Sequence, residues 1–117
     1  KNYSALSKAN FRMWTNTGTV SYIAPEVFQD SEYTELVDSW SAGVILYTML
    51  CGSLPFQAEL KTDLIDKIVA AEYEMSGEKW ENVSEGAKNL VQNLLQKNPE
   101  KRYTPFEVLA DPWIVNV

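Results

Sequence analysis

The feature that most constrains the fold is an apolar run over residues 38–50, which reads Asp-Ser-Trp-Ser-Ala-Gly-Val-Ile-Leu-Tyr-Thr-Met-Leu. Its apolar side chains surround most of a helical circumference, which is typical of a helix buried inside a domain. By position alone, Asp38 is predicted as the N-cap of this helix and Gly52 as its C-cap. The run predicts one central helix around which the rest of the chain packs.

Capping and proline signals predict the other helices. A short helix is expected over residues 24–28, a third helix capped by Thr62, and a fourth capped by Ser84 that ends at Asn98-Pro99. Residues 72–83 are expected to form a linker. Near the end of the chain, residues 104–107 read Thr-Pro-Phe-Glu, the pattern of a capping box, and residues 111–113 repeat the cap and the proline.

No segment alternates with period two, so the expected fold is mainly α, with five or six helices and a long polar loop in front. The 45% hydrophobic and 22% charged composition suits one globular domain. The longest apolar stretch, residues 44–51, is far shorter than the roughly 20 residues that span a bilayer, so no membrane span is expected.

Charge and residue inventory exclude several function classes. The net charge of −6 argues against binding to nucleic acid, which depends on clustered Lys and Arg. The chain has no His, which excludes a Ser/His/Asp hydrolase centre and a His-ligated zinc, and no metal site is expected. The single Cys51 cannot form an intramolecular disulfide, which favours a reducing, cytoplasmic setting.

Five motifs occur in order along the chain. Residues 18–26 read G-T-V-S-Y-I-A-P-E, and the D-S-W-S-A-G-V stretch begins the predicted central helix. G-S-L-P-F, L-L-Q-K-N-P-E-K-R and D-P-W-I follow at residues 52–56, 94–102 and 111–114. This order resembles the protein kinases, whose activation segment ends in A-P-E and whose later motifs read D-x-W-S-x-G-V, G-x-x-P-F, L-L-x-x-[DN]-P-x-x-R and H-P-W-[IL].

The resemblance implies the helical large lobe (C-lobe) of the protein-kinase-like fold, truncated and without the β-rich small lobe. Residues 1–117 would be a partial kinase domain, with the activation segment and substrate-docking loop in residues 1–23 and the helical C-lobe in residues 24–117. The polar start at Lys1, without Met, also reads as a segment cut from a longer chain. The implied activity is transfer of the ATP γ-phosphate to Ser or Thr hydroxyls of proteins.

The resemblance also assigns roles to individual residues. Glu26 and Arg102 would form a buried ion pair, for which the planar guanidinium of Arg is well suited. Asp38 would accept hydrogen bonds from the catalytic loop of the parent domain, and the Thr19 hydroxyl would bind the catalytic aspartate and lysine there. Both residues would support catalysis from outside the reacting groups.

The substrate residue just after the phosphoacceptor would lie against Gly18, Thr19, Val20 and Tyr22. The Gly-Thr pair and Tyr22 favour a Ser/Thr kinase over a tyrosine kinase. Thr15 lies where many kinases are phosphorylated for activation, with Thr17 as the second candidate, because a phosphate could order the loop against basic residues.

Within the family, residues 68–91 resemble the calcium/calmodulin-dependent and calcium-dependent kinases, which share an I-x-x-x-x-Y stretch, a Trp and a V-S-x-x-A-K-x-L-[IV] pattern. One departure is Thr48, which stands where some kinases have a Glu that grips a substrate arginine. That arginine preference therefore cannot be carried over.

The sequence contains no Gly-rich loop, strand lysine, H-R-D or D-F-G motif, which a working kinase needs. ATP and Mg²⁺ would therefore belong to the parent kinase, and the isolated chain is expected to bind neither and to be inactive. Its expected partners are protein substrates and the rest of the kinase domain or a companion chain, with self-association through exposed apolar surface.

Two other readings stay open at this stage. The parent could be a pseudokinase or scaffold that uses this lobe for protein binding, which the sequence before Lys1 would decide. The chain could also be an unrelated helical interaction domain, in which case Glu26 and Arg102 would not be in contact.

Overall fold

A computed structural model describes residues 20–29 and 32–116 of the chain. The predicted mainly helical class is confirmed, because the described residues form seven α-helices, one 3-10 turn and no strand. In chain order these are α3 (Pro25–Phe28), α4 (Leu36–Cys51), α5 (Lys61–Ala70), α6 (Glu78–Glu81), α7 (Glu85–Leu94), η1 (Pro99–Lys101), α8 (Pro105–Ala110) and α9 (Pro112–Val115).

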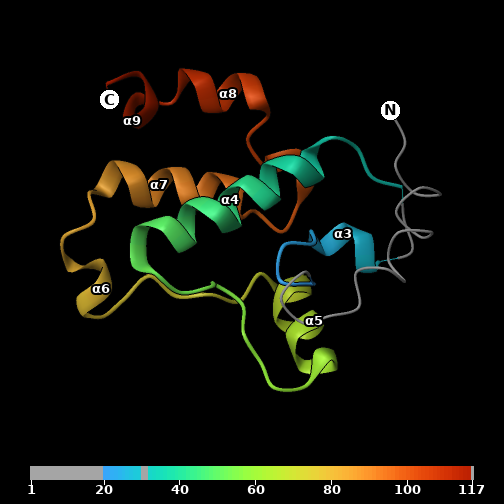
Figure 1. Ribbon diagram of the computed structural model, residues 1–117. Coiled ribbons are helices and arrows are strands. Elements are labelled where there is room, and N and C mark those ends of the chain that lie inside the picture. Colours follow the sequence, from blue (N-terminus) through green and yellow to red (C-terminus); the bar gives the residue numbers. More distant parts are fainter. Residues whose placement is uncertain (1–19, 30–31, 117) are drawn as a thin grey trace.

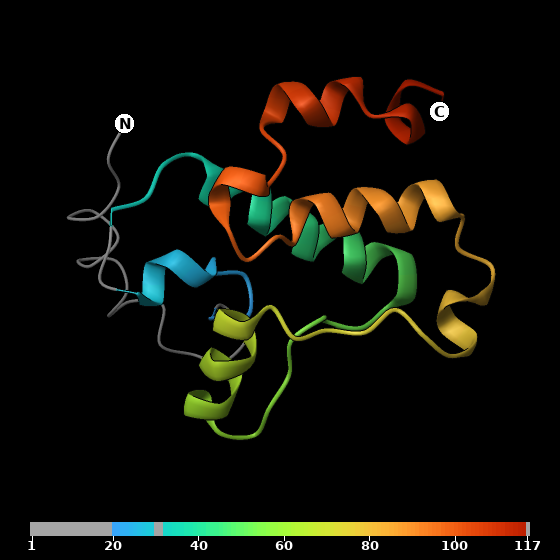
Figure 2. The same cartoon turned by 180° about the vertical axis from the view of Figure 1, so that it is seen from behind.

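The long helix α4 is the centre of the fold, with α7 packed along it in both views (Figures 1 and 2). A glycine permits the close approach: a Cβ at Gly43 would lie 2.7 Å from the Leu94 Cβ and 2.9 Å from the Leu95 Cδ2. Helices α8 and α9 contact each other, and α9 also contacts α7. Helices α3 and α5 pack together on the other side of α4 (Figure 1).

A chain of aromatic rings joins α4 to the segments that follow it. Trp40 stacks on Phe56 at 5.5 Å between ring centroids, and Phe56 meets Tyr73 edge-on at 5.9 Å. Tyr73 in turn meets Tyr47 at 6.1 Å, and Tyr47 lies 4.8 Å from Trp80. These contacts carry the core from α4 through the α4–α5 loop to α6.

Several capping predictions are confirmed. Gly52 ends α4 with a φ of 84°, a left-handed conformation that glycine adopts without steric cost. The Ser84 hydroxyl accepts from the Ala87 N–H at 3.2 Å, and Thr104 and Glu107 form the complete capping box of α8. Asp111 caps α9 by accepting from the Trp113 N–H at 2.9 Å.

Other helix boundaries were predicted wrongly. Helix α4 begins at Leu36, so Asp38 lies in its first turn and is not its N-cap. Leu60 occupies the N-cap position of α5 but makes no side-chain hydrogen bond there, and Thr62 lies inside the helix. Local pattern placed both starts two to three residues too late, because neither observed start has a side-chain cap to mark it.

The stretch after α5 also differs from the prediction. Helix α7 ends at Leu94 rather than at Asn98-Pro99, and the chain then turns through η1. The expected linker contains the one-turn helix α6, which buries Trp80. Its order therefore comes from the burial of one large side chain, because a single turn has little stability of its own.

Within residues 20–29 and 32–116, no helix combines the length and apolarity needed to cross a bilayer. Over the same residues, no cluster of His, Cys, Asp or Glu is arranged to hold a metal ion.

Candidate functional site

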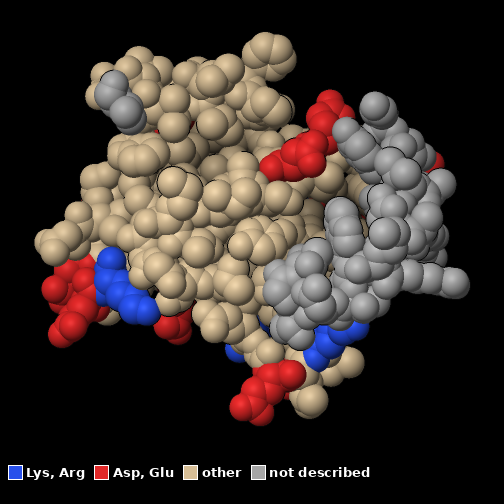
Figure 3. All heavy atoms as spheres, viewed as in Figure 1, with Lys and Arg blue, Asp and Glu red and all other residues tan. Residues whose placement is uncertain are grey.

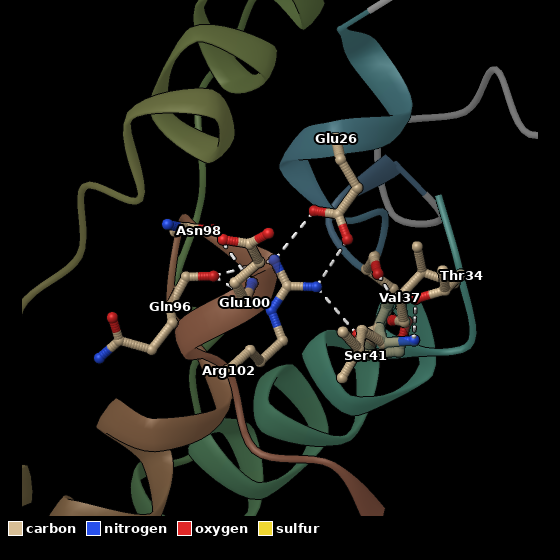
Figure 4. A network of polar contacts seen from close by, with 10 residues as sticks. Glu26, Thr34, Val37, Ser41, Gln96, Asn98, Glu100 and Arg102 are labelled. Carbon is tan, nitrogen blue, oxygen red and sulfur yellow. Dashed lines mark hydrogen bonds and ion pairs between the residues drawn. The ribbon is translucent and has the colours of Figure 1, made fainter. Parts of the chain in front are cut away.

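The buried centre of the candidate site is an ion pair between the first and last parts of the described chain. The Arg102 Nη1 donates to Glu26 Oε2 at 2.7 Å, and Nη2 donates to Glu26 Oε1 at 2.9 Å (Figure 4). Both side chains are almost fully buried, at 0% and 5% exposure. The structure thus brings together two residues that are 76 positions apart, in the bidentate geometry that Arg favours with a carboxylate.

All five N–H groups of the Arg102 guanidinium have acceptors. Besides the two bonds to Glu26, Nη1 donates to the Leu36 carbonyl at 2.9 Å, and Nη2 and Nε donate to the Gln96 carbonyl at 2.9 and 3.1 Å. The guanidinium carbon lies 5.2 Å from the centre of the Trp40 ring, within the range of a cation–π contact.

The energetic consequence follows from this complete pairing. Burial of a charge costs several kcal/mol of lost hydration, which a counter-ion and hydrogen bonds must offset. Removal of one partner of a buried pair typically lowers stability by about 3–5 kcal/mol. Arg102 satisfies that condition by joining α3, the start of α4 and the turn after α7 at one point (Figure 4). The pair therefore holds residues 20–29 against the helical core.

Two serines add to this attachment. The Ser41 hydroxyl on α4 donates to the Tyr22 carbonyl at 2.8 Å, and the Ser21 hydroxyl donates to the Phe56 carbonyl at 3.4 Å. Val20 is fully buried in the core and the Tyr22 side chain is half-buried. The segment before α3 is thus fastened to α4 and to the α4–α5 loop.

The other residues assigned by resemblance are placed in part. Asp38 is exposed, and its carboxylate has no hydrogen-bond partner among residues 20–29 and 32–116. Its role toward a catalytic loop stays a prediction, as does the role of Val20 and Tyr22 toward substrate. Thr15, Thr17, Gly18 and Thr19 lie outside the described residues.

Thr48 has a local bond of its own. Its hydroxyl donates to the Val44 carbonyl one turn earlier, at 2.8 Å. The hydroxyl is thus engaged within α4.

An apolar surface opens beside the central helix. Figure 3 shows that the face seen in Figure 1 is largely free of charged side chains, which gather mainly at its margins. A cavity of about 290 Å³ on the molecule is lined only by apolar residues of α4, α7, α8 and α9. Met49 and Ile45 of α4, which line it, are 77% and 50% exposed.

The comparison with known proteins agrees with the order of the motifs. The protein kinase domain family matches residues 2–114 of the chain, nearly its whole length. The chain belongs to this family. The buried Glu26–Arg102 pair of this kinase chain is therefore part of a kinase domain, and the alternative of an unrelated helical domain is excluded.

The kinase chain is similar to several curated relatives. It is 47% identical over 111 residues to the serine/threonine-protein kinase RCK2 of Saccharomyces cerevisiae, covering 93% of this chain and 18% of that protein. It is 45% identical over 97 residues to calcium-dependent protein kinase 19 of Arabidopsis thaliana, covering 83% and 17%. For the mouse serine/threonine-protein kinase DCLK2 the values are 42% over 104 residues, with 87% and 14% covered. The kinase chain thus spans less than a fifth of the length of each of these relatives.

Sequence reasoning missed two partners of Arg102, the carbonyls of Leu36 and Gln96. Backbone acceptors leave no residue-type signal, so only the path of the chain could reveal them. It also missed α6, for which Trp80 in a polar stretch was the available signal.

Proposed function

We propose that the kinase chain is the C-lobe portion of a serine/threonine protein kinase of the calcium/calmodulin-dependent or calcium-dependent group. The complete enzyme would use ATP and Mg²⁺ to phosphorylate Ser and Thr hydroxyls of protein substrates. This chain would supply the activation segment, in residues 1–23, and the surface on which substrates dock. The chain alone would be inactive, and the protein would be cytoplasmic.

The observation that carries the proposal is the fully paired Arg102. Its bonds to Glu26 and to the Leu36 and Gln96 carbonyls fasten α3 to the helical core. The Ser21 and Ser41 bonds fasten the segment just before α3. Phosphoryl transfer depends on positioning more than on covalent chemistry by the protein, so a docking segment needs such a support. Asp38 in the first turn of α4 is exposed and its carboxylate has no hydrogen-bond partner among the described residues, so it is available to bond a catalytic loop.

The subgroup assignment rests on sequence likeness. A calcium-dependent protein kinase is among the relatives at 45% identity, and residues 68–91 carry the pattern of that group. Calcium itself would act elsewhere, since the sequence has no EF-hand loop.

A chimera tests the proposal. The matching segment of calcium-dependent protein kinase 19 is replaced with this chain, and phosphate transfer from ATP to Ser, Thr and Tyr peptides is measured. Transfer to Ser and Thr alone is expected. Asp38→Asn should lower kcat by about 100-fold or more, on the scale of lost positioning, whereas exposed Glu100→Gln should not change it.

The outcomes of this test are separable. A chimera that folds, as judged by its circular dichroism, but transfers no phosphate contradicts the catalytic proposal. Phosphate transfer by the 117-residue chain alone contradicts its proposed inactivity. Intact-mass analysis after activation tests phosphorylation, which is expected on Thr15 or, second, Thr17, and an activated chimera without added phosphate argues against both.

A pseudokinase or scaffold is the second candidate, and the exposed apolar surface beside α4 favours it. A patch of this kind typically binds another protein. The occupant would be the remaining kinase lobe, a companion chain or a second copy. Capture of a protein partner by a folded chimera that never transfers phosphate would support this candidate over the first.

A further inference from the structure

A second cavity, lined by polar and apolar groups in about equal measure, lies between α7 and the C-terminal helix α9. Its volume is about 340 Å³, Glu26 and Arg102 do not line it, and it shares one lining residue, Trp113, with the apolar cavity beside α4. The two helices approach closely here, since a Cβ at Gly86 would lie 3.2 Å from the Trp113 Cδ1. Figures 1 and 2 both place the C-terminal segment beside the first turns of α7.

The cavity contains a buried carboxylate. Asp111 is only 5% exposed, and it accepts hydrogen bonds from the Tyr103 hydroxyl at 3.1 Å and from the Trp113 N–H at 2.9 Å. The ion pairs among the described residues are Lys88–Glu85 and Arg102–Glu26, so no described Lys or Arg lies within 4.0 Å of Asp111. Asp111 is thus a buried acid without a cationic partner in the described part of the chain.

Burial without a counter-ion is unusual for an acidic residue. Buried charges are normally paired, because neutral hydrogen bonds compensate only part of the lost hydration. A carboxylate offers about four acceptor positions, and the Tyr103 and Trp113 bonds occupy two of them. Two positions therefore remain for a further donor.

The rest of the lining suits a planar organic cation. Asn89, Gln92 and Asn93, which carry amide side chains, are among the residues that line the cavity, together with Trp113. Amide oxygens accept N–H bonds, and an indole face attracts cations, Arg guanidinium groups most often. A small hard metal ion would instead need more oxygen ligands at short distance.

We infer that this cavity binds a guanidinium group, held by Asp111, the neighbouring amides and Trp113. The guanidinium fork matches the free acceptor positions of a carboxylate, and its flat surface suits the indole. The net charge of −6 adds a weak general attraction for cations. The guanidinium could come from an arginine side chain of a partner protein or from a free small molecule.

The test titrates the 117-residue chain with methylguanidinium at constant ionic strength and follows the NMR signals of the Asn89 and Asn93 amides and the Trp113 indole N–H. Saturable shifts of all three are expected. Asp111→Asn should weaken binding at least tenfold, while Asn retains the capping function. Glu100→Gln removes one exposed acid away from the cavity and should leave the affinity unchanged.

The titration can also overturn the proposed guanidinium site. Equal shifts in wild type and Asp111→Asn, or shifts that never saturate, overturn the inference. If Asp111→Asn fails to fold, Asp111→Ser, which is also a good cap, takes its place. An arginine-containing peptide that binds at least tenfold more tightly than methylguanidinium identifies a protein side chain as the source, and equal affinities identify a small molecule.

Discussion

At the scale of single residues, Arg102 shows what a buried charge requires. It has an acceptor for each N–H, one carboxylate as counter-ion and an aromatic face beside it. Glu85 and Lys88 form the contrasting pair, at 3.8 Å with Glu85 84% exposed. Exposed pairs of this kind contribute roughly 0–1 kcal/mol, so the two ion pairs should respond very differently to mutation.

Glu26→Gln is expected to lower the free energy of unfolding by about 3 kcal/mol, because it leaves the Arg102 charge buried without its counter-ion. Urea unfolding of the chain measures the change. The matched control Glu85→Gln neutralises the exposed acid and should change stability by less than about 0.5 kcal/mol. Similar losses in the two variants would contradict a structural role for the buried pair.

Tyr47 provides a pH-dependent case. Burial raises its pKa above the ordinary tyrosine value of about 10, and the nearby Cys51 adds to this rise. The hydroxyl donates to the Glu74 carbonyl at 2.6 Å. Because the pKa of Tyr47 is higher in the folded than in the unfolded state, its protonated hydroxyl contributes to stability below about pH 10. This contribution is lost as the pH rises through the folded-state pKa.

Tyr47→Phe should therefore be less stable than wild type by about 1 kcal/mol at neutral pH, the contribution of one hydrogen bond. The difference should shrink as the pH rises above about 10, because only the wild-type hydroxyl ionises. Urea unfolding at a series of pH values measures this. A difference that stays constant into the alkaline range would show that Tyr47 does not control the pH dependence.

At the scale of elements, the α4–α7 pair organises the molecule. Helix α4 is apolar around most of its surface and can be buried on several sides, whereas α7 has one apolar face that includes Ala87, Leu90, Val91 and Leu94. Gly43 lets that face approach the α4 backbone. The close packing of α4 against α7 therefore depends on residue 43 being a glycine, which has no side chain.

Gly43→Ala is expected to destabilise the fold by about 1–3 kcal/mol despite the better helix propensity of Ala, because its Cβ would overlap Leu94 and Leu95. Thermal and urea unfolding measure the loss. Ala42→Ser, on the exposed side of the same turn, should shift stability by about 0.5 kcal/mol or less. Stabilisation by Gly43→Ala would contradict the close packing of the two helices.

At the scale of the whole molecule, self-association depends on where charged and apolar side chains lie on the surface more than on their total number. The chain carries a net charge of −6, yet the charges on the face in Figure 3 lie mainly at its margins. Ile45 and Met49 of α4, which line the apolar cavity, are 50% and 77% exposed. Net charge opposes association, and apolar patches promote it. Association should therefore occur through this apolar cavity.

The prediction is that the chain self-associates at micromolar concentration and that Ile45→Glu with Met49→Glu makes it monomeric, as measured by sedimentation velocity. Leu60→Glu is the control, since Leu60 is 62% exposed but lies in the α4–α5 loop, outside this cavity. A monomeric wild-type chain, or equal dissociation by both substitutions, would count against the apolar surface as the site of association.

Capping residues in the sequence correctly predicted those helix ends whose hydrogen bonds join residues close together along the chain. The caps at Ser84, Thr104 and Asp111 and the glycine after α4 bond groups within a few positions along the chain, so the residue type almost determines the geometry. The spacing of the five motifs was enough to indicate the kinase family. Starts without side-chain caps, at α4 and α5, were misplaced because propensity alone locates helix ends poorly.

The sequence by itself thus determined a mainly helical kinase segment with a buried central helix. Only the tertiary structure decided the partners of its buried charges. Arg102 binds a carboxylate 76 residues away and two backbone carbonyls, which cannot be predicted from residue types. Asp111 is buried without a Lys or Arg partner among the described residues. The reason is physical: a cap is completed by its own neighbours, whereas the desolvation of a charge depends on everything the fold places around it.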